Sequence, residues 1–433
     1  MSNSQAAKLS ELATEITVGY VGPMVNEYKA SGVPFLRSLN VEPGRINTNE
    51  LKFIDGTFHA KLRKSALRPG DVVIVRTGKP GVASVIPDTL AEANCSDLVI
   101  VRPGPKLDPR FLAYYVNSVA QEHVDAHVVG AVQQHFNIGS AKEIEIPRWP
   151  LEAQRAVARI LGALDDKIEL HRRMNRTLET LAQKLFRSWF VDFDPVVAKS
   201  EGRKPFGLSN ELAALFPSEF EDSELGPVPR GWRPVPLGDA IRLVRDLVDP
   251  QEAGLEEFDH FSIPAFDSGQ RPVREMGSAI KSGKYLVPDD AILLSKLNPE
   301  TPRVWWPTPD AQRRAIASTE FLVCRAKPEV NRVWLYWQLR DADFLDEFAT
   351  RVTGTSNSHQ RVRPDDLLRL ERVDAGQALR DRFAGLVEAS TKRMVANLAQ
   401  SQKLAALRDL LLPRLLSGEL RVPVAERAIT AAL

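Results

Sequence analysis

Two loops of the chain carry polar side chains that can read the edges of DNA bases. The first, GAVQQHFN, begins at Gly130, and the second, TGTSNSHQRVR, begins at Thr353. Asparagine and glutamine form paired hydrogen bonds with adenine, and arginine forms them with guanine, each pair giving about 1–3 kcal/mol of discrimination. The same residue types are common in ordinary surface loops, so that alternative stays open. The candidate base-reading residues are Gln133, Gln134, His135 and Asn137 in the first loop and Thr353, Ser356, Asn357, Ser358, His359, Gln360 and Arg361 in the second.

Further candidate DNA-binding residues follow two short apolar runs that are expected to be strands. These runs are VVIV, from Val72, and AILL, from Ala291. Contacts from basic and small polar side chains to phosphates position a protein on a duplex without reading its sequence. The alternative is that these residues are solvated strand ends without a ligand. The candidates are Arg76, Thr77 and Lys79 after the first run and Lys296, Asn298 and Arg303 after the second.

The sequence contains no recognisable pattern of a catalytic or metal site. A P-loop needs a glycine five residues before its Gly-Lys pair, but Val73 stands there before Gly78-Lys79, and Gly283-Lys284 is followed by Tyr285. The tetrapeptide of DNA amino-methyltransferases, Asn or Asp followed by Pro-Pro and an aromatic residue, is absent. The seven histidines show no metal-ligand spacing. We therefore predict no catalytic residue, no metal and no cofactor in this chain.

Composition is typical of a soluble globular protein with more than one domain. The chain has 433 residues, and a single core rarely extends over such a length. Cys95 and Cys324 are too few for a disulfide framework, and no uncharged apolar run approaches the ~18 residues of a membrane span. We expect a cytoplasmic protein. The net charge of +1 is low for a free-standing nucleic-acid binder, so DNA binding must depend on local patches or on a partner protein.

Two segments with heptad spacing predict long helices that pair with each other. Apolar residues recur at steps of four and three from Leu151 to about Phe190 and from about Gln377 to Leu416. Such seams need a partner helix. Polar residues interrupt the middle of both seams, where they most often set helix register rather than catalyse a reaction. The expected seam of the second helix includes Leu379, Phe383, Leu386, Leu404, Leu407 and Leu411. The candidate register residues are His171, Asn175, Asn397 and Ser401.

The segments that precede the two helices match each other in order, which predicts an internal duplication. LRPGDVVIVRTGKP, from Leu67, aligns with LVPDDAILLSKLNP, from Leu286, and the two polar loops align at Gly130 and Gly354. A nearly constant offset across several ordered blocks is hard to obtain by chance. The other matched residues are Leu9 with Leu237, Arg102 with Arg325, Tyr114 with Tyr336 and Gln154 with Gln377.

The stretch DSELGPVPRGW, from Asp222, separates the two copies. Its prolines and glycines exclude a helix interior or a central strand. It is interpreted as the end of a linker and the entrance to the second copy, onto which Trp232 is expected to pack. The first copy lacks this entrance, so its first strand is expected to be less anchored. The predicted parts are a first strand-rich domain (1–150), a first helix (151–192), a linker (193–231), a second strand-rich domain (232–372), a second helix (373–418) and a tail (419–433).

These segments resemble the specificity (S) subunits of type I restriction–modification enzymes. The resemblance covers essentially the whole chain. Its strongest segments are PRWPLEAQRAVARILGALDDKIELHRRMNRTLETLAQKLFRSWFVDFDP, from Pro147, LFPSEFEDSELGPVPRGW, from Leu215, and LRDLLLPRLLSGEL, from Leu407, and RPGDVVIVRTG, from Arg68, adds support.

The resemblance implies an α+β fold with two strand-rich target recognition domains, each followed by a long helix. The helices would pair as an antiparallel coiled coil with pseudo-twofold symmetry and set the spacer of an asymmetric, bipartite site on double-stranded DNA. Two modification (methyltransferase) subunits and two restriction (translocase and nuclease) subunits would bind this non-catalytic chain. S-adenosylmethionine, ATP and Mg²⁺ would belong to those partners, and no membrane would be involved.

Two other classes of function remain open from the residues alone. The first is a self-contained DNA methyltransferase or nuclease with similar recognition domains, against which the missing motifs argue. The second is a duplicated scaffold that binds only protein, which the near-neutral net charge favours.

Overall fold

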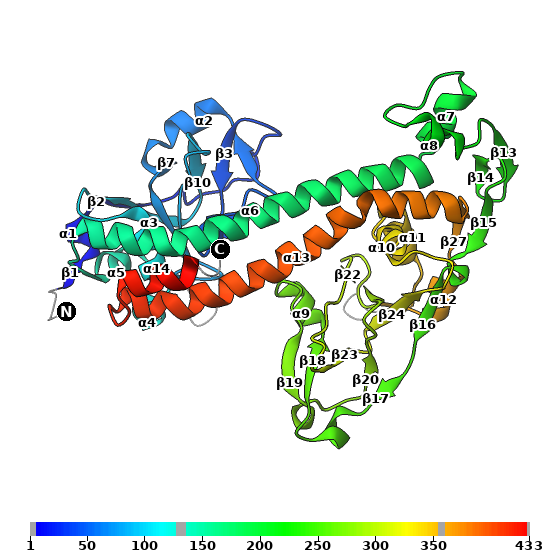
Figure 1. Cartoon of the computed structure of the whole chain (residues 1–433). Coiled ribbons are helices and arrows are strands. Elements are labelled where there is room, and N and C mark those ends of the chain that lie inside the picture. The colour runs from blue at the N-terminus through cyan, green and yellow to red at the C-terminus, as the bar shows by residue number, and fades with distance from the viewer. Residues whose placement is uncertain (1–5, 127–135, 354–359, 431–433) are drawn as a thin grey trace. The chain divides into compact units, whose positions relative to one another are not determined.

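The computed structural model describes residues 6–126, 136–353 and 360–430, which form two compact units (Figure 1). Unit 1 comprises residues 1–170 and 400–433, and unit 2 comprises residues 171–399. Both units contain strands and a section of each long helix, so the unit borders fall inside the helices rather than at their ends. The long helices are α6 (Leu151–Phe190) and α13 (Gln377–Leu416).

Unit 1 contains two four-stranded sheets. In the first sheet all neighbours are antiparallel, in the order β2-β11-β8-β9. The second has the order β6-β3-β10-β7, with a parallel pair β3–β10 at its centre. The first sheet consists of β2 (Ala13–Val18), β8 (Val72–Val75), β9 (Ala83–Val85) and β11 (Leu98–Pro103). The second consists of β3 (Val33–Leu36), β6 (Lys52–Ile54), β7 (Ala66–Leu67) and β10 (Ala93–Cys95).

Unit 2 contains a four-stranded and a five-stranded sheet. The first is again antiparallel throughout, in the order β16-β24-β21-β22. The second has the order β17-β20-β23-β18-β19, with a parallel pair β18–β23. The strands of the first are β16 (Ile241–Val244), β21 (Ala291–Ser295), β22 (Val304–Trp305) and β24 (Phe321–Ala326). Those of the second are β17 (Leu247–Val248), β18 (Glu257–Phe261), β19 (Val273–Met276), β20 (Lys284–Leu286) and β23 (Arg314–Ala317).

The strand order of unit 1 recurs in unit 2, which confirms the predicted duplication. β2, β11, β8 and β9 correspond to β16, β24, β21 and β22, and β6, β3, β10 and β7 correspond to β19, β18, β23 and β20. The single parallel pair occupies the same place in both second sheets. Strand β17 is an addition at the edge of the unit 2 sheet.

Each copy is closed by pairing its first strand with the strand that precedes its long helix. β1 (Ala6–Lys8) pairs antiparallel with β12 (Glu145–Pro147), and β15 (Arg233–Pro236) pairs in the same way with β27 (Glu371–Asp374). The matched residues Leu9 and Leu237 follow these strands and are buried. Their N–H groups donate to the carbonyls of Ile144 and Leu370, at 2.8 and 2.7 Å. The first strand of copy one is therefore paired like its counterpart, but over three residue pairs instead of four and without an equivalent of the buried Trp232.

The long helices follow their apolar seams, with one exception. In unit 1, Leu161, Leu164 and Ile168 of α6 share a core with Leu404 and Leu411 of α13. In unit 2, Phe186 of α6 and Phe383 of α13 lie with ring centroids 5.5 Å apart. The expected seam position Leu386 is 56% exposed, because the neighbouring Val387 takes the buried position.

The segment 193–231, predicted as a linker, is folded and belongs to unit 2. It forms α7 (Asp194–Ser200), α8 (Asn210–Ala214) and a hairpin of β13 (Phe220–Ser223) and β14 (Gly226–Pro229). DSELGPVPRGW is therefore the second half of a hairpin and the chain beyond it. The buried Trp232 packs against Phe193 and Phe216 of this segment, at ring distances of 5.6 and 6.4 Å, as well as in the core of the second copy.

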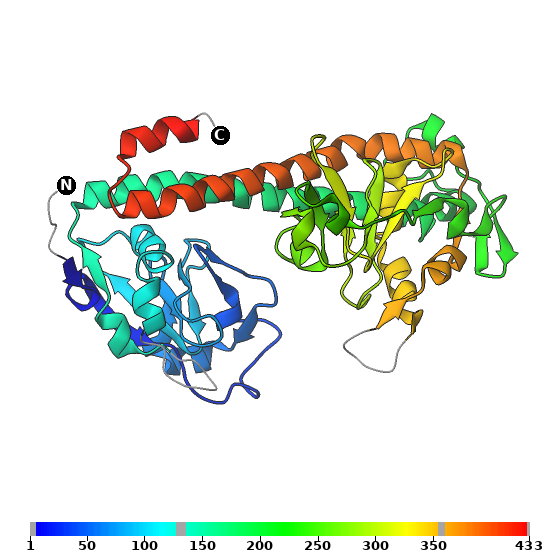
Figure 2. The same ribbon diagram turned by 90° about the horizontal axis from the view of Figure 1, so that it is seen from below.

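The predicted C-terminal tail contains a further helix, α14 (Val422–Thr430), that lies beside the first part of α6 (Figure 2). Ala425 is fully buried in the unit 1 core, and Glu426 pairs with Arg159 of α6 at 3.1 Å.

No helix in the described part of the chain is long and apolar enough to cross a membrane. The remaining helices are α1 (Leu9–Leu12), α2 (Gly56–Lys61), α3 (Pro109–Val116), α4 (Gln121–Ala126), α5 (Ile138–Lys142), α9 (Ile263–Asp267), α10 (Arg332–Gln338), α11 (Ala342–Thr350) and α12 (Pro364–Arg369). The remaining strands are β4 (Val41–Glu42), β5 (Arg45–Ile46), β25 (Val352–Thr353) and β26 (Arg361–Val362).

Candidate nucleic-acid interface

In unit 1 the turn after β8 meets the end of the first polar loop. The Phe136 N–H donates to the Arg76 carbonyl at 2.9 Å, and Arg76 Nε donates back to the Phe136 carbonyl at 3.1 Å. Asn137 accepts a hydrogen bond from the Ser140 N–H at 2.8 Å and so caps α5. Thr77 is half-buried and Lys79 is exposed in the same turn.

In unit 2 the turn after β21 meets the second polar loop in the same way. The Val362 N–H donates to the Lys296 carbonyl at 3.1 Å, and the Asn298 N–H donates to the Gln360 carbonyl at 2.9 Å. Thr353 Oγ1 donates to the Arg361 carbonyl at 3.1 Å, within the pair β25–β26. Two groups of candidates that are far apart in the sequence are thus brought together in each copy.

The two turns also share an unusual backbone conformation. Gly78 and Asn298 each lie three residues after the end of their strand, β8 or β21, with φ of 86° and 46°. These values lie in the left-handed region, which glycine enters freely and asparagine tolerates better than most residues. The duplication therefore preserves the shape of this turn while its side chains differ.

Seven candidates lie outside the described residues. They are Gln133, Gln134, His135, Ser356, Asn357, Ser358 and His359.

The candidate arginines form ion pairs with carboxylates of their own copy. Arg76 pairs with Asp97, and Arg361 holds both carboxylate oxygens of Glu320, with contacts at 2.8 and 2.9 Å. Hydrogen bonding to Glu320 raises the pKa of Arg361. Asp97 and Glu320 correspond, since each directly precedes its strand, β11 or β24. The two copies therefore use an equivalent carboxylate to hold an arginine that comes from a different place in each.

Arg303 lies beside the unit 2 turn, where its carbonyl accepts from the Ser295 N–H at 2.9 Å, but its side chain is held by another element. Its guanidinium pairs with both oxygens of Asp267 of α9, at 2.7 and 2.9 Å, and donates to the Thr301 carbonyl. Its side chain is 12% exposed. The geometry at Arg303 is that of an internal clamp, and its predicted phosphate contact stays a prediction.

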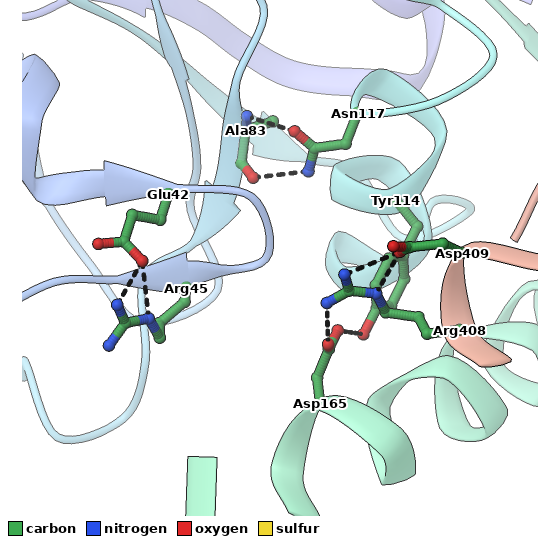
Figure 3. A network of polar contacts seen from close by, with 8 residues as sticks. All are labelled: Glu42, Arg45, Ala83, Tyr114, Asn117, Asp165, Arg408 and Asp409. Atoms are coloured by element: carbon green, nitrogen blue, oxygen red, sulfur yellow. Dashed lines mark hydrogen bonds and ion pairs between the residues drawn. The ribbon is translucent and has the colours of Figure 1, made fainter. Parts of the chain in front are cut away.

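Polar contacts that the sequence did not reveal hold the strand-rich part of unit 1 against both helices (Figure 3). Tyr114 of α3 donates to Asp165 of α6 at 2.5 Å, and Arg408 of α13 pairs with the same carboxylate at 2.6 Å. Arg408 also donates to Asp409 at 2.8 and 2.9 Å. Burial and the adjacent Asp165 raise the pKa of Tyr114, so its hydroxyl stays protonated and keeps donating.

Two smaller contacts in the same region support this arrangement (Figure 3). Asn117, which follows α3, binds both backbone groups of Ala83 in β9, at 2.9 and 2.8 Å. Arg45 pairs with Glu42 in the β4–β5 hairpin and lies 3.6 Å from Glu169 of α6. Both fix unit 1 strands to the helical layer.

Unit 2 has a contact at the equivalent position with different chemistry. Thr391 of α13 corresponds to Asp165 of α6, since the two helices begin and end 226 positions apart. It accepts a hydrogen bond from Trp337 Nε1 of α10 at 3.0 Å. The N-caps of α3 and α10, Asp108 and Asn331, lie 223 positions apart, so the counterpart of Tyr114 is Trp337 and not Tyr336, as the sequence match had it. The signal in the sequence that could have pointed to this site was the position of Asp165 inside an apolar seam.

The offset of 226 positions between α6 and α13 corrects a second match made from the sequence. The counterpart of Gln154 is Arg380, not Gln377, which is exposed. Gln154 and Arg380 are both buried, and they donate to the corresponding carbonyls of Lys106 and Glu329, at 3.0 and 3.5 Å. The sequence match paired two glutamines because they are the same residue type. The two copies share the position in the helix and not the identity of the side chain.

Of the candidate register residues, the structure joins Asn175 to Asn397. Asn397 Nδ2 donates to Asn175 Oδ1 at 2.8 Å, and Asn175 Nδ2 donates to the Met394 carbonyl at 3.0 Å. His171 and Asn397 are each 1% exposed, and Ser401 is half-buried. A hydrogen bond between the buried Asn397 and the half-buried Asn175 favours a single alignment of the two helices.

The comparisons with known proteins agree with one another. A family model described as "Type I restriction modification DNA specificity domain" matches residues 54–180. The type I restriction enzyme HindI specificity subunit of Haemophilus influenzae is 26% identical, over 66% of this chain and 70% of that protein. The MjaIX specificity subunit of Methanocaldococcus jannaschii is 28% identical, over 65% of this chain and 62% of that protein. A crystal structure of the type I restriction–modification S subunit from M. genitalium shares the fold, with a TM-score of 0.57, 16% identity and 95% of each chain covered.

The fold is thus that of a duplicated α+β protein in which each copy continues into a long helix. Residues 54–180 match the DNA specificity domain of type I restriction–modification systems, and about two thirds of the chain is similar to specificity subunits of these enzymes. The expectation that this chain is a non-catalytic subunit agrees with the names of those relatives.

Proposed function

We propose that this chain reads an asymmetric, bipartite target on double-stranded DNA, with one copy of the repeat on each half-site. The observation that carries the proposal is the recurrence of one site in two copies. The turn after β8 in the first copy and the turn after β21 in the second are each hydrogen-bonded to a polar loop. Two copies with the same backbone arrangement but different side chains can recognise two different base sequences.

The two long helices would act as the ruler between half-sites. Antiparallel coiled-coil pairing with pseudo-twofold symmetry is supported by the contact order inside unit 2, where Asn175 meets Asn397 and Phe186, further along α6, meets the earlier Phe383. The equal lengths of α6 and α13, 40 residues each, fit two related struts. Such a ruler would fix the length of an unspecified spacer.

Two modification subunits and two restriction subunits would dock on this chain and supply the chemistry, with S-adenosylmethionine, ATP and Mg²⁺. Apolar side chains exposed on the helices support docking, because each is a site that a partner would cover. They are Leu170 and Leu181 on α6 and Leu386 and Leu410 on α13, each at least 50% exposed.

A salt titration of duplex binding, run with and without the modification subunit, tests the proposal. A DNA reader loses affinity steeply as salt rises, because phosphate contacts release bound counterions, and it keeps a preference for its target duplex. A scaffold that binds only protein would show neither effect. Incubation of the purified chain alone with DNA and S-adenosylmethionine is expected to give no methyl transfer, and transfer there would instead favour a self-contained methyltransferase.

A further inference from the structure

The stretch of unit 1 that leads from β6 through β7 to β8 is strongly basic. Between Asp55 and Asp71 the chain contains four lysines and arginines and no aspartate or glutamate. We call these four residues the basic connection. They are Lys61, Arg63, Lys64 and Arg68.

All four side chains are exposed, and no carboxylate of the described residues forms an ion pair with any of them. This distinguishes them from Arg76, Arg303 and Arg361, whose charges are held by Asp97, Asp267 and Glu320. Unpaired surface cations remain available to an external anion, whereas a cation already in an ion pair must first give up its partner.

The backbone that carries the basic connection is held firmly. Asp55 caps α2 by accepting from the Phe58 N–H at 2.7 Å, and Phe58 packs edge-on to Tyr20 at 5.5 Å. Asn94 of β10 contacts His59 at 3.3 Å and donates to the Leu62 carbonyl at 3.2 Å. The four cations therefore project from an ordered backbone, so that binding has to order only their side chains and not the chain itself.

The basic connection is linked to the candidate interface through β10. Asn94, which holds α2, lies three residues before Asp97, and Asp97 pairs with Arg76 in the turn after β8. A duplex that reached this turn would thus have the basic connection as the neighbouring surface of the same copy.

The equivalent connection of unit 2, between β19 and β20, lacks this charge. Over residues 277–283 it contains one basic residue, the exposed Lys281. The next lysine, Lys284, is 7% exposed and donates to Ser282 at 2.7 and 2.8 Å. Arg68 itself aligns with Val287. The duplication has kept the strands here but not the cations.

We propose that the basic connection is a phosphate-contact surface, which gives the first copy a larger share of the sequence-independent affinity for duplex DNA than the second. The inference rests on the proposed function. It assigns the contact to residues outside the two polar loops and makes the two copies electrostatically unequal.

The test compares the triple variant Lys61→Glu, Arg63→Glu, Lys64→Glu of the full chain with a control of equal charge change. The control is Arg203→Glu, Lys204→Glu, Arg230→Glu, three exposed cations of the segment 193–231. Affinity is measured from low to moderate salt on the target duplex and on a random duplex. A second variant, with glutamine at 61, 63 and 64, removes the contacts without adding repulsion, and circular dichroism checks that each variant folds.

The first variant is expected to bind both duplexes at least about tenfold more weakly at low salt, with a salt slope shallower by about three, since each lost phosphate contact removes about 0.9 from the slope. Preference for the target duplex should stay unchanged, the glutamine variant should show the same change in slope, and the control should match the wild type.

Wild-type slope and affinity in both variants, with target preference intact, would overturn this inference and leave the proposed function standing. So would an unchanged slope combined with loss of the modification subunit, which would make the surface a protein interface. Absence of any duplex binding by the wild type, with or without that subunit, would overturn the proposed function and this inference together.

Discussion

Asp165 serves two partners at once. It accepts from Tyr114 and pairs with Arg408, and so joins α3, α6 and α13 within unit 1. Its side chain is 21% exposed and that of Arg408 is 25% exposed, so water weakens this pair less than a pair at the surface. Thr391 takes the equivalent place in unit 2 and needs no charge, because its partner there is the indole N–H of Trp337.

Replacement of Asp165 by alanine is expected to lower the free energy of unfolding of unit 1 by about 1–3 kcal/mol, because Arg408 and Tyr114 both lose a partly buried partner. The measurement is chemical denaturation of the full chain. Asp166→Ala is the matched control. Asp166 is 66% exposed and pairs only loosely with Arg110, at 3.4 Å, so it should change stability by less than about 0.5 kcal/mol. Equal effects of the two substitutions would contradict the role given to Asp165.

The left-handed backbone of Asn298 predicts different effects for its replacement by glycine and by valine. Because Gly78 takes the same left-handed turn in the first copy, Asn298→Gly should leave the free energy of unfolding nearly unchanged. Asn298→Val should lower it by about 1–2 kcal/mol, since a β-branched residue is strained at φ of 46°. Thermal or urea unfolding measures both, and a tolerated valine would show that this turn relaxes without cost.

Local patterns in the sequence predicted the elements well but the contacts between them poorly. The heptad steps placed both long helices within a few residues, because apolar periodicity is a local property. The partnership of Asp165 with Arg408 spans 243 positions and has no local signature. The segment 193–231 was interpreted as a linker from its prolines and glycines, yet its Val196 and Phe216 are buried in the core of unit 2. Turn-forming residues also occur in folded hairpins, and only burial distinguishes the two cases.

At the element scale, if the two long helices set the distance between the half-sites, an insertion in both helices should change the length of the spacer. Seven residues inserted after Leu170 in α6, with seven inserted after Ala399 in α13, would lengthen each helix by about 10 Å, or about three base pairs at roughly 3.4 Å each. These points lie at the border between the two units, so both cores stay intact. The tolerated spacer should grow by about that amount while both half-site sequences remain the same. Methylation of a library of spacer lengths measures this, and a changed half-site sequence would argue against the ruler.

At the scale of the whole molecule, the repeated strand order is what the proposed reading of two half-sites by one chain requires. Both copies keep the sheets, the closing strand pair and the left-handed turn, while the loops and the β6–β7 connection differ. The shared features are those that both cores need, and the features that differ include the candidate DNA-binding residues. A net charge of +1 is then compatible with DNA binding, because the basic connection concentrates charge on one copy.

The most direct test is methylation-sensitive sequencing of DNA from cells that express this chain with its modification subunit. Two reading copies held by paired helices predict a single motif with two different specified parts, separated by a constant number of unspecified bases. A contiguous motif, or two parts at variable separation, would contradict the account.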